Sequence, residues 1–334
     1  VIVAYTTLGG FLAASTSDFI QSIIMSIALV IVLSYGIISV GGFDGVVAHV
    51  GDLKGFLSIT STHDGATNTA TPYSVLSIAS TLAWGLGYFG MPHILLRFMA
   101  IEDTKKLKLS RRVASVWVVI SMSVAVSIGI IGYAMSAEGV IPNLKDSETI
   151  IVQIAHVLST HGIIFAIIAG VILAGILAST MSTSDSQLLA ASSSVSENLL
   201  EGVLNLNLSA GVKIVVARGS VIIISIIAMF LASNPNSSVF QIVSFAWAGF
   251  GATFGPVMLF ALFWKRSNKY GAISGMVAGG IMIFVWKFLV RPMGGVLGIY
   301  ELLPAFIVAS IFIVVVSLLT PAPEKEIVDE FESI

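Results

Sequence analysis

Hydroxyl side chains concentrate in one apolar stretch of the sequence, Gly170–Glu197, which reads GVILAGILASTMSTSDSQLLAASSSVSE. Four of them recur at i, i+3, i+4 and i+7, namely Ser179, Ser182, Thr183 and Ser186. A helix places residues with this spacing on one face. Hydroxyl and carbonyl oxygens are hard, neutral ligands that can replace water around a small cation such as Na⁺. The pattern therefore predicts part of a path for an ion or a solute. It predicts one long helix at Gly162–Glu197, with Ser179, Ser182 and Thr183 facing the protein interior.

A packing seam is the competing interpretation, because small residues and hydroxyls also let helices approach closely in a bilayer. Asp185 lies inside the same apolar segment, and intramembrane carboxylates are costly and usually functional. This favours the ion path. Asp185 itself is one helical step off the hydroxyl face, so it is either a proton or ion relay or a structural hydrogen-bond partner of a neighbouring span.

A second constellation combines helix-weakening and aromatic residues in the middle of the apolar segment Tyr73–Phe98, in the sequence WGLGYFGMP at residues 84–92. A broken helix at membrane depth is tolerated only where it is buried in protein or lines a cavity. We predict an interruption near Gly85–Gly90, with Trp84 and Tyr88 lining a central cavity. The simpler alternative is a proline-kinked span with aromatic side chains at the membrane interface.

The composition places these residues in a membrane protein. Of 334 residues, 56% are hydrophobic and 10% are charged, and the mean hydropathy is +1.00. Soluble domains carry about 25% charged residues. Cysteine is absent, which excludes disulfides and thiolate chemistry. The sequence has no HExxH-like pair, no nucleophile–base–orienter set and no phosphate-binding loop, so we expect neither an enzyme nor a nucleic-acid partner.

Apolar segments predict an all-α polytopic membrane protein with about eight complete transmembrane helices and the end of a ninth. The end of the ninth is Val1–Ala14, and the complete spans are about Phe19–Val40, Tyr73–Phe98, Val113–Met135, Gly162–Glu197, Val212–Leu231, Val239–Trp264, Ala272–Leu289 and Leu302–Leu319. A polar joint, Ser15–Asp18, separates the first two segments, and Gly41–Thr71 is a polar loop without a functional prediction. We expect a single transporter domain at residues 1–320 and a cytoplasmic tail at residues 321–334.

Basic residues predict the orientation of these spans. Six of them lie between Arg97 and Arg112, which assigns that loop to the cytoplasm. Alternation along the chain then places the C-terminal tail inside, in a multi-pass protein of the inner cell membrane. Lys287 and Arg291, on a loop assigned to the outside, run against this pattern.

Three stretches carry a family resemblance: WGLGYFGMPHILLRFMA, ILASTMSTSDSQLLAASSSVSE and SFAWAGFGATFGPVMLFALFWKR. They resemble the sodium:solute symporter family, specifically its sodium/proline branch, and the similarity extends from Tyr5 to about Thr320. The resemblance implies the LeuT-type inverted-repeat fold with about thirteen spans. Since the chain starts inside an apolar run, we expect the first four spans and the start of the fifth to precede Val1.

The resemblance implies a sodium site on the hydroxyl-rich helix. Ser182 and Thr183 match the sodium-coordinating hydroxyls of the family, and Ser179 matches the residue whose backbone carbonyl joins them. Asp18, in the sequence SDFIQ, matches a carboxylate near the inner end of the ion path. The family draws further sodium ligands from its broken second span, which this sequence does not contain.

The resemblance also implies the transported solute. Trp84, Tyr88 and Pro92 match positions on the broken helix that are implicated in substrate binding. The implied function is secondary active transport by alternating access, in which Na⁺ drives uptake of a small amino acid, with L-proline as the expected solute. No cofactor is implied besides Na⁺ as the coupling ion, and the lipid bilayer is the expected surrounding.

Two alternatives to a proline symporter remain at this stage. The solute could be another carboxylate-bearing compound, such as pantothenate or a short-chain acid. The chain could also be a symporter-like sensor domain of the kind fused to signalling kinases. The last fourteen residues show no start of a coiled coil or a kinase domain, which disfavours the sensor.

Overall fold

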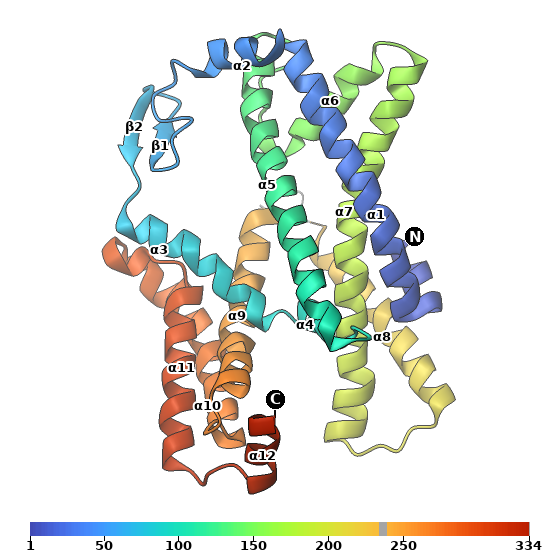
Figure 1. Ribbon diagram of the computed structural model, residues 1–334, viewed down its shortest axis with the longest axis vertical. Helices are drawn as coiled ribbons and strands as arrows, with labels where there is room; N and C mark the ends of the chain where they lie inside the picture. Colours follow the sequence, from blue (N-terminus) through green and yellow to red (C-terminus); the bar gives the residue numbers. More distant parts are fainter. Residues whose placement is uncertain (234–238, 334) are drawn as a thin grey trace. The chain divides into compact units, whose positions relative to one another are not determined.

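The computed structural model describes residues 1–233 and 239–333, and most of them are helical (Figure 1). Seven helical segments in this part of the chain are long and apolar enough to cross a membrane. They are Ile2–Ser39, Thr104–Ala137, Ile163–Val203, Ala210–Leu231, Val239–Phe263, Lys269–Met293 and Leu302–Leu319. The chain is therefore a multi-pass, all-α membrane protein, as the composition predicts.

The chain forms two compact units. The first combines Val1–Pro72 with Ile101–Leu231, and the second combines Tyr73–Ala100 with Ala232–Ile334. Each unit brings together segments that are distant in sequence, because long helices pair with partners more than a hundred residues away.

The first unit is built on the pairing of α1 (Ile2–Ser39) with α7 (Ile163–Ser193), which run alongside each other (Figure 1). Its other helices are α2 (Gly42–Val50), α5 (Leu107–Ala137), α6 (Ile150–Ser159) and α8 (Ala210–Leu231). Large apolar side chains from α1, α5, α6 and α7 fill its core, among them Val32, Met135, Ile154 and Ile172. Gly175 permits the close approach of α7 to α1, because a Cβ atom there would press on the Ala28 side chain.

The N-terminal end of α1 differs from the prediction. The polar joint Ser15–Asp18 is helical, and the break lies earlier, at Gly10, where φ is 59° and ψ is −150°. Glycine is the residue that tolerates this backbone conformation. The polar side chains do not break the helix because they bond within it: Thr16 Oγ1 donates to the Leu12 carbonyl, and Gln21 Nε2 donates to Ser17 Oγ. The predicted joint at Ser15–Asp18 is therefore wrong: Val1–Ala14 and Phe19–Val40 belong to one helix, Ile2–Ser39, whose break lies at Gly10.

The polar loop Gly41–Thr71 is structured. It contains α2 and the antiparallel hairpin β1 (Ser61–Asp64) and β2 (Thr69–Pro72), with Ser61 opposite Pro72 and Asp64 opposite Thr69. Asp64 accepts hydrogen bonds from Thr67 Oγ1 at 2.7 Å and from the Ala66 amide at 2.9 Å. These bonds lower the pKa of the Asp64 carboxyl.

The second unit contains the predicted broken span. Tyr73–Phe98 divides into α3 (Val75–Ala83), the 3₁₀ segment η1 (Trp84–Gly90) and α4 (Pro92–Met99). The interruption predicted near Gly85–Gly90 is therefore confirmed. Because of this interruption, Tyr73–Phe98 is the one predicted complete span that is not among the seven long apolar helices of the described residues.

The second unit also contains α9 (Val239–Phe263), α10 (Lys269–Val285), α11 (Leu302–Leu319) and α12 (Lys325–Ser333). Three short helical segments lie between α10 and α11, namely η5 (Trp286–Val290), η6 (Arg291–Met293) and η7 (Gly295–Gly298). Helices α10 and α11 lie side by side (Figure 1). Three glycines of α10 are four residues apart. Added Cβ atoms at Gly271 and Gly275 would meet Ser317 and Ile313 of α11, and one at Gly279 would meet Ala252 of α9 and Ala309 of α11. This is the small-residue packing expected between membrane helices.

Candidate sodium and solute sites

The hydroxyl-rich segment is one long helix, as predicted. Helix α7 continues without interruption into a π-helical segment, η4 (Ser194–Val203). Within it, Ser182 Oγ donates to the Ser179 carbonyl at 3.1 Å, and Thr183 Oγ1 donates to the same carbonyl at 3.4 Å. Three oxygens thus converge within a single helical turn, which we name the hydroxyl turn (Ser179, Ser182 and Thr183). Their chemistry, two hydroxyls and a carbonyl, is that of Na⁺ ligands.

The exposure of the hydroxyl turn differs from the expectation that its side chains face the interior. Ser179 and Thr183 are exposed, and Ser182 is half-buried. The buried face of α7 is the one that packs on α1, α6 and α8, and it carries Asp185 and Ser186. The expectation is therefore wrong for the described chain, because helical geometry turns the residues at 179 and 183 away from this contact.

Asp185 lies on that buried face and is 0% exposed. Tyr5 Oη, from the segment of α1 before the Gly10 break, donates to Asp185 Oδ2 at 2.7 Å. Ser186 Oγ donates to Asp185 Oδ1 at 3.3 Å. Asp185 thus has a structural hydrogen bond to a neighbouring helix, which was one of its two predicted roles. Nothing in the sequence pointed to Tyr5, because its partner lies 180 residues away.

Asp18 is half-buried on α1, next to Ser17 and one turn before the buried Gln21. The structure therefore places Asp18 and Tyr5 on α1 and the hydroxyl turn and Asp185 on α7, in the same compact unit. Among residues 1–233 and 239–333, no group of three His, Asp or Glu side chains could hold a metal ion.

The broken span presents aromatic surface. The Trp84 ring, half-buried, lies nearly parallel to Trp247 and Phe240 of α9, with centroids 5.6 Å away in both cases. It is also stacked on Tyr300, at 6.0 Å. Tyr88 contacts Trp247 edge-on at 4.7 Å and is 51% exposed. The backbone carbonyl of Trp84 accepts a 2.9 Å hydrogen bond from Trp247 Nε1, which ties the start of η1 to α9.

The glycines of η1 are required for close approach to α9. A Cβ atom at Gly87 would overlap the Trp247 indole, and one at Gly90 would overlap the backbone at Phe250 and Gly251. Pro92 is half-buried at the first turn of α4, where its missing N–H costs no helical bond. The density of Gly and Pro therefore both ends α3 and lets the chain lie against α9.

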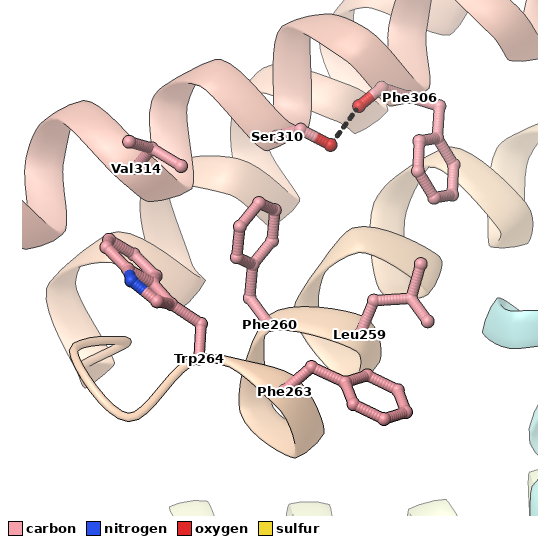
Figure 2. A pocket seen from close by; sticks show the side chains of 7 residues that line it. All are labelled: Leu259, Phe260, Phe263, Trp264, Phe306, Ser310 and Val314. Carbon is pink, nitrogen blue, oxygen red and sulfur yellow. Dashed lines mark hydrogen bonds between the residues drawn. The ribbon is translucent and has the colours of Figure 1, made fainter.

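A pocket of about 580 Å³ lies between α9 and α11 in the second unit (Figure 2). Its lining is aromatic and aliphatic, and the hydroxyl of Ser310 is engaged with the Phe306 carbonyl at 2.8 Å. Such a lining does not suit a polar solute, and neither Trp84 nor Tyr88 belongs to it. The central cavity predicted beside these two residues stays a prediction.

Comparison with known proteins gives the family. The model of the sodium:solute symporter family matches residues 1–279. The chain belongs to this family. The High-affinity proline transporter PutP of Bacillus subtilis (strain 168) is 40% identical over 331 residues, covering 99% of this chain and 66% of its own. The Osmoregulated proline transporter OpuE of the same organism is 39% identical, covering 97% and 63%. The Sodium/proline symporter of Escherichia coli (strain K12) is 37% identical, covering 98% and 62%.

The fold has a counterpart among solved structures. A Na⁺-coupled sialic acid symporter, captured in a substrate-bound outward-open state, matches with a TM-score of 0.72 at 18% identity. The match covers 97% of this chain and 66% of the symporter. The predicted LeuT-type transporter fold of this symporter family is thereby confirmed. The chain spans just under two thirds of the length of these relatives.

Proposed function

We propose that this chain is part of a Na⁺-coupled symporter that takes up L-proline by alternating access. The convergence of three oxygens in the hydroxyl turn is the observation that carries the proposal. Support for the solute comes from the relatives, since those at 37–40% identity over nearly the whole chain are named as proline transporters. A transporter rather than an enzyme is the activity that this combination favours.

The hydroxyl turn contributes one side of the proposed sodium shell. Ser182 and Thr183 bind through their hydroxyls, and Ser179 binds through its carbonyl. The exposed side of the turn leaves room for ligands supplied by other segments of the transporter. Without such ligands, three oxygens fall short of the six or so that a small hard cation prefers.

Asp185 and Asp18 belong to the proposed ion path. Both lie in the unit that contains the hydroxyl turn, one on α7 and one on α1. A buried carboxylate attracts a cation that leaves the neutral oxygens, and the Tyr5 bond holds the Asp185 side chain in one orientation. An inward-moving Na⁺ gains about 2.3 kcal/mol per 100 mV, which together with its concentration gradient accumulates a neutral solute.

Trp84, Tyr88 and Pro92 are the proposed substrate-binding residues. The exposed Tyr88 ring and the half-buried Trp84 ring offer flat apolar surface for a pyrrolidine ring. The 3₁₀ segment between them interrupts the regular helical bonding, and such interruptions are where transporters bind polar solute groups. A solute with a different body but the same carboxylate, such as pantothenate or a short-chain acid, is the alternative that competition must exclude.

The proposed location and topology follow the sequence. Residues 1–320 act as one transporter domain in the cell membrane, and residues 321–334 lie on the cytoplasmic side. Within that tail, α12 is paired with the end of the membrane domain through Lys265 and Glu332, 2.8 Å apart.

Uptake of labelled proline by vesicles that contain the full-length protein tests the proposal. We expect accumulation with an inward Na⁺ gradient and none when K⁺ replaces Na⁺. Unlabelled proline should compete, whereas pantothenate and acetate should not. Proline uptake that is indifferent to Na⁺ would refute the coupling, and competition by pantothenate alone would refute the solute.

A further inference from the structure

An ion cluster around a buried carboxylate lies on the loop whose positive charges run against the predicted orientation. Glu301 is 0% exposed, and both of its carboxylate oxygens are paired. Lys287 Nζ lies 3.2 Å from Oε1, and Arg291 Nη1 lies 2.6 Å from Oε2. A buried carboxylate is costly unless its charge is compensated, so the two cations hold the beginning of α11 against the helical segments that follow α10, at residues 286–293. Lys287 Nζ also lies 4.5 Å from the centre of the Phe245 ring of α9.

The residue before Glu301 joins three other elements. Tyr300 is 8% exposed; its phenol donates to the Ser244 carbonyl of α9 at 2.6 Å, and its amide donates to Ser80 Oγ of α3 at 3.1 Å. Its ring is stacked on Trp84, with 16° between the ring planes. Burial raises the pKa of the Tyr300 phenol, and the Glu301 charge raises it further, so the phenol remains a donor.

We propose that Tyr300 is a positioning residue for Trp84 and thereby sets the affinity for the solute. The ion cluster fixes the backbone at 300–301, and Tyr300 transmits that position to η1 through its ring. Trp84 is thus held between α9 on one side and the loop before α11 on another. This inference rests on the proposed role of Trp84 in substrate binding. The inference also gives a role to Lys287 and Arg291, the two basic residues that run against the predicted orientation and have no part in the proposed ion and solute sites.

The variants separate the ring, the hydroxyl and the ion cluster. Tyr300→Phe keeps the stacking and removes the bond to Ser244, whereas Tyr300→Leu removes both. Glu301→Gln leaves two cations without their carboxylate. Tyr270→Leu is the matched tyrosine control, at the half-exposed start of α10, and Glu332→Gln is the matched carboxylate control, in an exposed ion pair.

Kinetics of the full-length protein in vesicles, at saturating Na⁺, give the first readout. We expect Tyr300→Leu to raise the KM for proline by about tenfold or more, and Tyr300→Phe and Glu301→Gln by about twofold to fivefold, with kcat per folded molecule nearly unchanged. Both controls should keep the wild-type KM. The proposal would be overturned if the Tyr300 and Glu301 variants kept the wild-type KM and lowered only kcat or the yield of folded protein. That result would mean that these residues contribute to folding and not to solute affinity.

A second readout needs no solute. Because this chain has no cysteine, Gly85→Cys can report on η1 in a cysteine-free full-length background, and a side chain at Gly85 meets open space. We expect Tyr300→Leu to change the maleimide labelling rate at this position by about threefold or more, and Tyr270→Leu to leave it unchanged. An unchanged labelling rate in Tyr300→Leu would overturn the proposal that Tyr300 positions η1. If the wild-type protein fails to take up proline but Tyr300→Leu still changes the labelling rate, the proposed function is refuted and the positioning role of Tyr300 is retained.

Discussion

Ser182 and Thr183 differ from the other hydroxyls of α7 because they share one acceptor, the Ser179 carbonyl. Ser184, by contrast, donates to the Thr180 carbonyl alone. In the proposed sodium site, where other segments of the full-length transporter enclose the cation, replacing Ser182 or Thr183 by Ala removes one of its oxygen ligands. This should cost about 1–3 kcal/mol, a several-fold to hundred-fold loss of apparent Na⁺ affinity. The Na⁺ concentration for half-maximal proline uptake by the full-length protein measures it.

The hydroxyl-preserving exchanges Ser182→Thr and Thr183→Ser should cost far less, and Ser184→Ala should be neutral. A packing seam predicts the reverse at position 182, where alanine fits between helices and threonine is too large. Unchanged half-saturation in both alanine variants would end the sodium assignment. Proline binding should weaken in parallel, because coupling between two ligands is reciprocal.

Gly87 is the residue on which the aromatic surface of η1 depends most directly. A methyl group there would overlap the Trp247 indole and break its bond to the Trp84 carbonyl. We expect Gly87→Ala to destabilise the protein by about 1–3 kcal/mol and to raise the KM for proline. Gly85→Ala is the control, because Gly85 lies two residues earlier and a Cβ atom there meets open space. Thermal unfolding in detergent and uptake kinetics together check the prediction; equal behaviour of the two variants would contradict it.

Single residues also show where prediction from sequence ends. The spacing of Ser179, Ser182 and Thr183 was readable because helical periodicity is local. Tyr5 and Tyr300 were not, since each acquires its role from a partner 180 and 216 residues away, respectively Asp185 and Trp84. A tyrosine near the end of an apolar segment has the same local pattern whether it faces lipid or a buried carboxylate.

At the scale of elements, the break in α1 depends on the backbone conformation of one glycine, Gly10. Gly10 has a positive φ that a side chain would strain, whereas Gly129 of α5 lies in regular helix with open space around its Cβ position. Gly10→Ala should lower stability by about 1–3 kcal/mol, and Gly129→Ala should leave stability equal or slightly higher. Thermal unfolding of the full-length protein compares them. A neutral Gly10→Ala would mean that the break is not fixed by this residue.

Helix α12 is held to the end of α9 by the exposed pair Lys265–Glu332. The hydrogen bond and charge of Lys265 lower the pKa of Glu332, so the stabilisation is present above the ordinary carboxyl pKa and is lost as pH falls through the lowered value. Protection of the α12 amides, which is the observed hydrogen exchange rate compared with the intrinsic rate at the same pH, should fall at low pH. It should also fall in about 1 M salt, where the screening length is about 3 Å, and in Glu332→Gln at neutral pH. Exchange independent of all three would exclude this contact as the tether.

The elements were predictable where apolar length alone decides them, as in α5, α7, α8 and α11. The break at residues 84–90 was predictable from local Gly and Pro chemistry. The joint in α1 was misplaced because Ser15–Asp18 looked polar enough to end a helix, yet intrahelical hydrogen bonds satisfy those side chains. The burial of α7 could not be foreseen, since the choice of buried face depends on α1, which packs against it from far away in sequence.

For the whole molecule, the charge distribution predicts which loops face the cytoplasm. The exception consists of two basic residues, Lys287 and Arg291, against six between Arg97 and Arg112. The Arg97–Arg112 segment then dominates the asymmetry.

Cysteine accessibility in intact cells tests this orientation. Thr67→Cys, in the hairpin of the polar loop, should react with an impermeant maleimide from outside in a cysteine-free full-length background. Glu326→Cys, in α12, should react only after the membrane is permeabilised. The reverse pattern would invert the topology, and equal labelling of both before permeabilisation would contradict a transmembrane arrangement between them.

The acceptor that Ser182 and Thr183 share bears on whether the hydroxyl turn would bind a cation or an anion. Both hydroxyl protons are committed to the Ser179 carbonyl, so what Ser182 and Thr183 present outward is lone-pair electron density. In the proposed sodium site, an anion such as chloride would meet no hydroxyl donor from Ser182 or Thr183, whereas a cation would meet their oxygens. In that site, the resting geometry of one helical turn would favour a cation over an anion before any ion binds.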